Sequence, residues 1–315
     1  MNLSGLGDVS LVNNTTANED DLNSDGQETW VVLGTLMMIA GALVLALNSL
    51  CLIVLQRTTV ITEPTKVFMI SLNTSDLLLG ASHLLPSAVE HVVGYWPFGD
   101  FLCQLYSSIG NIFFDSSLFS LLLLTIDRYI GTFFPLRYPS LMTVKRARLL
   151  VCAVWILLII QAVLIYLIAN WQKTGLQCFW QWEETQLRNI ILAVHVLVPT
   201  IIITVLYIKM MMTALRHAKR IHQEGQVQNH LVGNHSYKAH RKSLTTVTIV
   251  TAALYLSLFP MVIIDVMKFV FEVDIPEFLP SLAYLFFTSN SWLNVIIYFL
   301  RNKELRKEAL KVLKC

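Results

Sequence analysis

Charge is scarce in this sequence. Only 14% of the 315 residues are Asp, Glu, Lys or Arg, whereas 55% are hydrophobic. A soluble domain usually carries about 25% charged residues. The shortage argues against an ordinary water-soluble enzyme or binding domain and indicates that much of the surface faces lipid. With a formal net charge of only +2, no nucleic-acid partner is expected.

Cysteine is also scarce, and a cleavable signal peptide is not visible. The five cysteines are too few for a disulfide-built scaffold. The first apolar run is too long for the apolar region of a signal peptide, so it is expected to act as an uncleaved signal anchor. Cys51 and Cys152 fall inside apolar runs and are most simply interpreted as small apolar residues.

Lys and Arg are absent from the first 29 residues, which contain six acidic residues instead. A segment of this composition cannot bury a core, so residues 1–29 are predicted to be a disordered tail. Three N-x-Ser/Thr sequons begin at Asn2, Asn13 and Asn14. They predict glycosylation only if the tail is extracellular.

Long apolar runs are what the sequence has in abundance. About 20 apolar residues cross a hydrocarbon core roughly 30 Å thick, and each run must be helical because unpaired backbone groups are costly in lipid. The sequence therefore predicts an all-α membrane protein, a seven-transmembrane helix bundle within residues 30–300. The expected spans are residues 30–56, 67–95, 102–133, 149–170, 189–213, 245–270 and 279–300.

The distribution of Lys and Arg predicts the orientation of the bundle. All but three of the 23 Lys and Arg fall on one side, the exceptions being Lys173, Arg188 and Lys268. Basic residues concentrate in cytoplasmic loops, so the N-terminus is expected outside the cell and the C-terminus in the cytoplasm. The protein is accordingly predicted to be a multi-pass plasma-membrane protein.

Residues 301–315 have a different pattern. Leu305, Ala309, Val312 and Leu313 share one face of a helix that also carries several Lys and Arg. This pattern predicts a short amphipathic cytoplasmic eighth helix on the anionic inner leaflet. Cys315 would then lie at the membrane surface, as a palmitoylation site or as a free thiol in a frayed tail.

The end of the third run carries the most informative motif. Asp127-Arg128-Tyr129 follows an apolar helix, and Pro135-Leu136-Arg137-Tyr138 comes shortly after it. Together with further landmarks, this resembles the rhodopsin-like (class A) G-protein-coupled receptors over residues 30–315, with amine receptors the nearest in look. The further landmarks are Trp155, Pro199, Tyr207, Pro260 and the run Asn294-Val295-Ile296-Ile297-Tyr298.

The resemblance implies a receptor that couples an extracellular ligand to a heterotrimeric G protein, and it implies no enzyme. It also implies a disulfide between Cys103 and Cys178, which both lie on the oxidising side. In such receptors Arg128 would leave Asp127 on activation and contact Tyr207 and the G protein. The residues assigned to this G-protein switch are Asp127, Arg128, Tyr129, Tyr207, Asn294 and Tyr298.

Three residues depart from the family pattern. Val295 replaces the proline of the seventh-helix motif, and Leu258 stands where most members have a tryptophan. His240 stands where many members have an acid that pairs with the arginine corresponding to Arg128. The usual inner lock is thus missing, although Asp127 can still restrain Arg128. This predicts a lowered activation barrier and some basal signalling.

Asp76 lies at mid-depth in the second span, where an ionisable side chain is costly and usually functional. Polar residues at a similar depth predict an inward-facing cluster, and from the residues alone it can be helix–helix hydrogen bonding or a cation site. The family resemblance favours an allosteric sodium site, with oxygen ligands suited to a hard cation, and no other cofactor. The residues concerned are Asn48, Asp76, Ser117, Asn290, Ser291 and Asn294.

The outer half of the bundle is the expected ligand pocket. Gly110 stands where amine receptors place an aspartate, and Thr288 stands where opsins place a lysine. An amine could instead pair with Asp115, Asp265 or Glu90, although Asp115 points about 140° away from Gly110. A small ligand is favoured, and a peptide stays open. The candidate lining residues are Gly110, Asn111, Phe114, His195, Met261, Val262, Asp265, Tyr284 and Thr288, with Trp180 and Trp182 above them.

Two other classes of function are weighed against the receptor. In a sodium- or proton-moving protein Asp76 would carry the ion, but no inverted repeat or pair of broken helices is seen. A membrane hydrolase would need a metal cluster at membrane depth. His83, His91 and His195 lack the spacing of such metal motifs.

Overall fold

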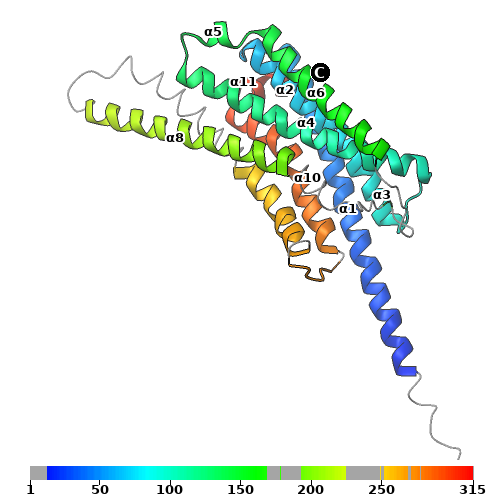
Figure 1. The fold of residues 1–315 in the computed structure, drawn as a ribbon. Helices are drawn as coiled ribbons and strands as arrows, with labels where there is room; N and C mark the ends of the chain where they lie inside the picture. The colour runs from blue at the N-terminus through cyan, green and yellow to red at the C-terminus, as the bar shows by residue number, and fades with distance from the viewer. Residues whose placement is uncertain are drawn as a thin grey trace, which may run out of the picture.

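The computed structural model describes residues 13–168, 178, 193–224, 249, 252–268, 271–276 and 278–314. The described part is helical apart from short connections, and the helices lie side by side in one bundle (Figure 1). The elements are α1 (Asn13–Arg57), α2 (Glu63–Leu79), η1 (Gly80–Leu84), α3 (Leu85–Val93), α4 (Gly99–Phe133), α5 (Tyr138–Leu141), α6 (Val144–Ile168), η2 (Ala193–Leu197), α8 (Val198–Glu224), α10 (Phe278–Arg301) and α11 (Lys303–Leu313). Residues 252–268 are also helical.

The all-α membrane fold predicted from the apolar runs is confirmed. Within the described residues, five helices are long and apolar enough to cross a membrane: Gln27–Arg57, Gly99–Phe133, Val144–Leu164, Val194–Thr213 and Phe278–Arg301. The second expected span is helical from Glu63 to Val93, but η1 divides it into shorter pieces. Only residues 249 and 252–268 of the sixth expected span are described.

The first helix begins earlier than the sequence predicted. Residues 1–29 were expected to be a disordered tail, whereas α1 begins at Asn13 and runs to Arg57. No proline lies between these two residues, so nothing in the backbone interrupts the ladder of helical hydrogen bonds. Asn13 and Asn14 form the first turn of α1, and Asn2 lies outside the described residues.

Two helices contain a wider, π-helical turn just before a proline. In the second helix η1 precedes Pro86, and in the fifth helix η2 precedes Pro199. A proline has no N–H for the carbonyl four residues earlier, and its ring crowds that carbonyl. A π turn relieves this crowding and re-aims the side chains it contains. His83 lies in the first of these turns and His195 in the second.

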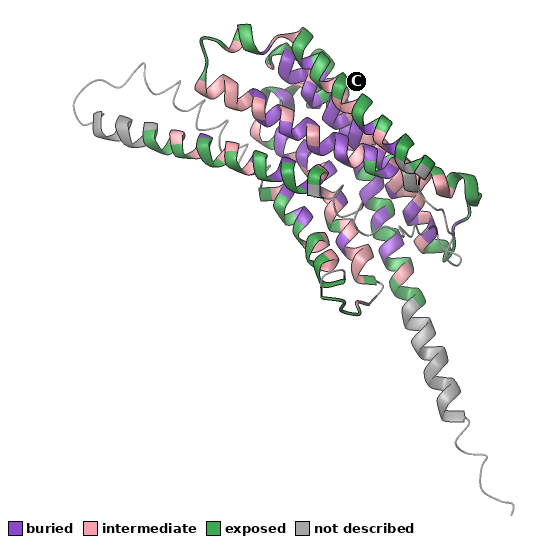
Figure 2. Ribbon diagram, viewed as in Figure 1, coloured by how far each residue is buried: buried purple, intermediate pink, exposed green. Residues whose placement is uncertain are grey.

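The buried side chains gather where the helices face one another, and the outward faces of α6 and α8 are largely exposed (Figure 2). Phe68, Leu121 and Val295 belong to the largest buried cluster and have at most 1% of their surface exposed. By contrast Leu157 and Ile201 are at least 60% exposed. Apolar side chains on the outside are expected in a protein whose surrounding solvent is lipid.

Glycine allows α1 to approach the second helix closely. A Cβ atom built on Gly34 would lie 2.9 Å from the backbone oxygen of Ala88 in α3. On Gly41 it would lie 2.5 Å from a methyl carbon of Leu85, and on Gly80 it would lie 2.7 Å from a methyl carbon of Val44. Small residues let membrane helices pack backbone against backbone, so these three glycines set the spacing.

Replacing Gly34 with valine is expected to destabilise the bundle by about 1–3 kcal/mol, the usual cost of overpacking. The added Cβ meets the backbone of α3, which cannot swing away as a flexible side chain can. Thermal unfolding of the purified protein measures the loss of stability. Met38→Ala is the control, because Met38 lies on the same helix with an exposed side chain and should lose little.

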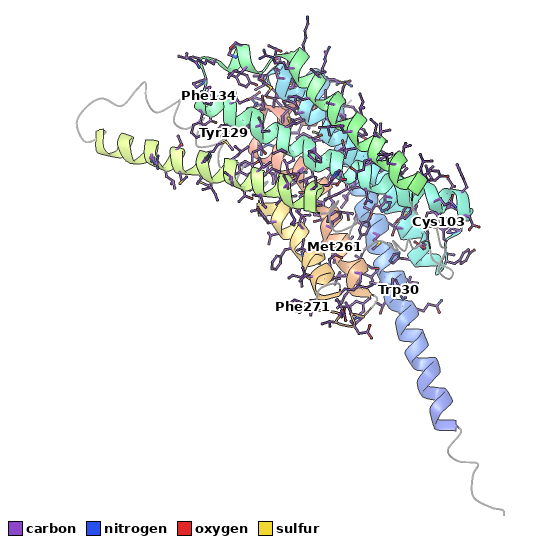
Figure 3. All side chains as sticks on the ribbon, in the orientation of Figure 1. Trp30, Cys103, Tyr129, Phe134, Met261 and Phe271 are labelled. Atoms are coloured by element: carbon purple, nitrogen blue, oxygen red, sulfur yellow. A yellow bond between two sulfur atoms is a disulfide. The ribbon has the colours of Figure 1, made fainter. Side chains whose placement is uncertain are left out.

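The two ends of the bundle are well separated. Trp30, Cys103 and Phe271 lie at one end, and Tyr129 and Phe134 lie at the other (Figure 3). The predicted eighth helix is present as α11. Asn302 caps its N-terminus, where the Asn302 side-chain oxygen accepts from the backbone N–H groups of Glu304 and Leu305.

The packed face of α11 is narrower than the sequence suggested. Leu305 and Ala309 are buried and Val312 packs against them, but Leu313 is 67% exposed. This helix packs on α1 and α10. Cys315 lies outside the described residues.

Candidate functional site

The inner end of α4 holds a compact polar network around Asp127. The Asp127 side chain is fully buried. Its Oδ2 accepts from Arg128 at 2.6 and 3.1 Å and from the hydroxyl of Thr65 at 2.7 Å. The Arg128 guanidinium also contacts the Thr65 hydroxyl. Arg128 is therefore held against its own helix and α2.

The second oxygen of Asp127 is held by the inner loop. Tyr138, at the start of α5, donates its hydroxyl to Oδ1 at 2.7 Å, and Thr62 lies 3.2 Å from the same hydroxyl. Burial raises the pKa of Tyr138, and its bond to Asp127 raises the pKa further. The phenol therefore keeps its proton and remains a donor.

The other predicted switch residues lie in the inner half of the bundle and have further contacts. Tyr207 of α8 accepts from the hydroxyl of Thr125 at 3.1 Å. Tyr129 stacks on Phe133, with ring centroids 4.4 Å apart. Asn294 and Tyr298 of α10 are buried. His240, where the family acid is missing, lies outside the described residues.

At mid-depth the structure brings most of the predicted polar layer together. Ser117 of α4 and Ser291 of α10 both donate to Oδ1 of Asp76, at 2.7 and 2.9 Å. The amide of Asn48 in α1 donates to the backbone oxygen of Ser291 at 3.2 Å. Side chains from four spans thus meet around one carboxylate.

This layer also has spare oxygen atoms. Several buried side-chain oxygens have no hydrogen-bond partner among the described residues, and those that belong to the predicted layer are Asp76 Oδ2, Asn48 Oδ1, Asn290 Oδ1 and Asn294 Oδ1. One carboxylate with neutral amide oxygens and two hydroxyls is a donor set suited to a hard monovalent cation. In the part of the chain described, no three His, Cys, Asp or Glu side chains are grouped as metal ligands. The residues present therefore fit sodium.

The outer end is closed by a disulfide. Cys103 near the start of α4 is bonded to Cys178, with an S–S distance of 2.06 Å, as the family resemblance implied. The backbone N–H of Cys178 donates to the carboxylate of Glu90 in α3. Through the disulfide and this hydrogen bond, Cys178 is joined to both α4 and α3, and one carboxylate oxygen of Glu90 is occupied.

Cys178→Ser is expected to lower stability by about 2–5 kcal/mol, because the bridge closes a long loop between positions separated by 75 residues. Surface expression and thermal unfolding of the protein check this. Cys152→Ser is the control, since Cys152 is an exposed free cysteine and should lose little.

Gly110 lies against an imidazole. A Cβ atom at Gly110 would lie 2.5 Å from Cε1 of His83, whose ring stacks on Tyr106 at 4.0 Å. Tyr284 meets the same ring edge-on at 5.8 Å. Position 110 therefore leaves no room for a longer side chain unless His83 moves.

The remaining predicted lining residues have different surroundings. Phe114 packs on Phe287 with ring centroids 4.1 Å apart. The Thr288 hydroxyl is used by its own helix, donating to the backbone oxygens of Tyr284 and Leu285 at 3.0 and 3.1 Å. Their role toward a ligand stays a prediction. Met261 and Asp265 are half-buried, Asn111 and Val262 are exposed, and Trp180 and Trp182 lie outside the described residues.

A buried acid–imidazole pair is the feature that sequence reasoning missed. His195 Nδ1 lies 2.9 Å from Oδ2 of Asp115, and only 7% of the Asp115 side chain is exposed. The two residues were treated separately in the sequence, His195 as a lining residue and Asp115 as pointing elsewhere. The sequence did contain one signal of this pair, because Asp115 and His195 are both ionisable residues inside apolar spans.

The described residues combine a helical membrane bundle, an arginine held by a buried carboxylate at one end, a second buried carboxylate at mid-depth and a disulfide at the other end, as the resemblance to seven-helix membrane receptors predicted. Comparison with protein families agrees, because residues 47–298 match the model described as 7 transmembrane receptor (rhodopsin family). The chain belongs to this family. It is a family of receptors rather than enzymes, as the sequence analysis expected.

Similar proteins include two classes of amine receptor. The alpha-1A adrenergic receptor of Oryzias latipes is 38% identical over 96 residues, which is 30% of this chain and 20% of that receptor. The human alpha-1D adrenergic receptor is 32% identical over 128 residues, or 41% of this chain and 21% of that receptor. The matches to these adrenergic relatives thus span about a fifth of their length. The histamine H2 receptor of Canis lupus familiaris is 27% identical over 261 residues, covering 80% of this chain and 70% of that receptor.

Proposed function

We propose that the protein is a plasma-membrane receptor that converts binding of a small extracellular ligand into activation of a heterotrimeric G protein. The observation that carries this proposal is the restrained Arg128. It is exposed enough to reach a partner, with 35% of its side chain accessible, yet it is held by a fully buried carboxylate. Such an arginine can be released by a modest shift of the neighbouring helices.

The orientation follows from the charges. The Lys- and Arg-rich connections would be cytoplasmic, which places Arg128, Tyr138 and α11 inside the cell and the Cys103–Cys178 disulfide outside. An oxidising exterior suits the disulfide. The N-terminus would then be extracellular, with Asn2, Asn13 and Asn14 open to glycosylation, and Cys315 would lie next to the inner leaflet.

A ligand acts by binding one state of the bundle better than the other. In the resting state Arg128 pairs with Asp127 and Thr65. In the active state Arg128 would contact Tyr207 and the G protein, and the basic ends of the fifth and sixth helices would help the G protein dock. A sodium ion held by Asp76 would favour the state in which its ligands from α2, α4 and α10 lie together, as they do in this structure.

The ligand is proposed to be small. Polar side chains of the outer half are partly or fully buried and closely spaced, as with His83 against Tyr106 and His195 against Asp115. Small-molecule sites have this character, with a few placed polar groups among apolar side chains. The adrenergic and histamine receptors among the relatives carry names of small amines. A peptide ligand is the second candidate.

The experiment is G-protein activation in cells that express the wild type or Arg128→Ala, measured without ligand and against amines, nucleosides, lipids and short peptides. We expect a wild-type response that Arg128→Ala abolishes at equal surface expression. Arg57→Ala is the matched control, because Arg57 is an exposed arginine at the same end of the bundle and should keep the response.

An unchanged response in Arg128→Ala would remove Arg128 from the switch. Silence in both proteins, together with a sodium or proton flux that depends on Asp76, would instead establish an ion-moving protein. The ligand class that activates the wild type also separates the small-molecule proposal from the peptide one.

A further inference from the structure

The Asp115–His195 pair joins two helices in the outer half of the bundle. Asp115 lies on α4 and His195 lies in η2, the π turn that begins the described part of the fifth helix. The carboxylate oxygen and the imidazole nitrogen are 2.9 Å apart, and 7% and 17% of the two side chains are exposed. Phe119, one turn further along α4, packs edge-on against the His195 ring at 5.8 Å.

A carboxylate this deep in an apolar bundle needs a cationic or hydrogen-bonding partner. His195 supplies a hydrogen bond whatever its protonation state, but it supplies positive charge only when it carries a second proton. An ammonium group carries a positive charge and three N–H donors at once. It is therefore a stronger partner for Asp115 than a neutral imidazole.

The other carboxylates predicted as amine partners are less suited to that role. Glu90 accepts from the backbone N–H of Cys178 and so helps to hold the disulfide in place. Asp265 is half-buried and has an interaction of its own. At position 110 the neighbouring His83 fills the space in which an acid would lie.

We infer that Asp115 is the carboxylate that binds a small protonated amine, and that the amine replaces His195 as its partner. This inference rests on the proposed receptor function and names the ligand class of its outer site. The ammonium group lies between α4 and η2, next to the Phe119 ring. The displaced His195 imidazole is free to hydrogen-bond a second polar group of the ligand.

The position of the pair explains how binding reaches the inner end. The same two helices are joined again at Thr125 and Tyr207, whose hydroxyls are 3.1 Å apart. Ten residues of α4 separate Asp115 from Thr125, which is about 15 Å along the axis. An amine that takes Asp115 from His195 removes the outer of these two polar contacts. The fifth helix is then held to α4 mainly at Tyr207, the residue proposed to receive Arg128.

The test measures amine binding by the full-length purified receptor as a shift of its thermal unfolding temperature. Phenethylamine and tyramine are the probes, and the neutral alcohols with the same carbon frames, phenethyl alcohol and tyrosol, are the controls. The proteins are the wild type, Asp115→Asn and Glu90→Gln. Asn keeps the shape of Asp115 without its charge, and Glu90→Gln is the matched loss of a carboxylate charge elsewhere in the outer half of the bundle.

We expect the amines to stabilise the wild type and the alcohols not to do so. Asp115→Asn should weaken amine binding by about 30-fold or more, the usual effect of removing one member of a buried charge pair. Glu90→Gln should bind the amines within about threefold of the wild type, since it keeps Asp115. The unfolding temperature of each variant without ligand shows that it is folded.

Amine binding that survives in Asp115→Asn overturns the inference, and its loss in Glu90→Gln alone moves the site to α3. If neither amine stabilises the wild type more than its alcohol, the ligand class is wrong. None of these results bears on the receptor function itself, which is decided by the dependence of G-protein activation on Arg128.

Discussion

Asp127→Asn is expected to raise ligand-independent G-protein activation about fivefold. Asp127 is the residue that restrains Arg128, and its other oxygen is held by Tyr138. Asparagine has no charge to attract the guanidinium. Its amide N–H group would also face Thr65, Tyr138 and Arg128, which are themselves hydrogen-bond donors to Asp127. With Arg128 partly screened by solvent, a shift of about 1 kcal/mol in favour of the released state is reasonable, and this corresponds to a factor of about five. The measurement is basal G-protein activation per receptor at the cell surface.

Graded variants separate this mechanism from general damage. Thr65→Val and Tyr138→Phe each remove one hydrogen bond to Asp127 and should raise basal activity less than Asp127→Asn. Arg57→Ala is the control, because Arg57 is an exposed arginine at the same end of the bundle and the variant should behave as the wild type. Basal activity that is unchanged or lower in Asp127→Asn, at equal surface expression, would show that Asp127 does not restrain Arg128.

The same network qualifies one expectation from the sequence. Because His240 stands where many members have the acid that pairs with Arg128, the sequence predicted some basal signalling. In the structure two groups hold Arg128, the carboxylate of Asp127 on its own helix and the hydroxyl of Thr65 on α2. Thr65 lies 63 residues earlier in the chain, so the motif at the end of α4 could not show it. The resting state therefore has more support than the sequence alone suggested.

The helical fold followed from composition, because a backbone in lipid has few alternatives to a helix. What the apolar runs did not show was local geometry. The π turns before Pro86 and Pro199 rotate the side chains before them, and this re-aims His83 and His195. A prediction that assumes a constant helical period misplaces residues that precede such a turn.

The mid-depth layer was predictable and the outer site was less so, for a physical reason. Asp76, Ser117 and Ser291 are polar residues inside long apolar runs, and such residues have few places to point except toward one another. Asp115 was discounted because it points about 140° away from Gly110. That direction is the one in which η2 lies, and only the packed structure shows which helix is there.

Four of the polar contacts above begin on one helix. Along α4, Asp115 pairs with His195, Ser117 with Asp76, Thr125 with Tyr207, and Asp127 with Thr65. The partners alternate between the fifth helix and α2. A ligand that moves the fifth helix relative to α4 therefore acts on two of these contacts directly, while the contacts with α2 oppose the movement.

The second large effect that we expect is stabilisation of the receptor by sodium, which would bind at Asp76, where α2 meets α4. Asp76 accepts from Ser117 and Ser291 through one oxygen, and its Oδ2 has no partner among the described residues. Unpaired amide oxygens of Asn48 and Asn294 belong to the same buried layer. A cation that binds these oxygens only in the folded resting state stabilises that state by mass action.

Sodium chloride is accordingly expected to raise the thermal unfolding temperature of the purified wild type above its value in potassium chloride at equal ionic strength. At ten times its dissociation constant a single bound sodium contributes about 1.4 kcal/mol. Asp76→Asn should abolish the difference between the two salts, because the carboxylate is the charged member of the site. Glu63→Gln, which removes an ion pair at the inner end, should keep the difference. An equal effect of both salts on the wild type would mean that they act by screening, and the polar layer would then be a set of interhelical hydrogen bonds.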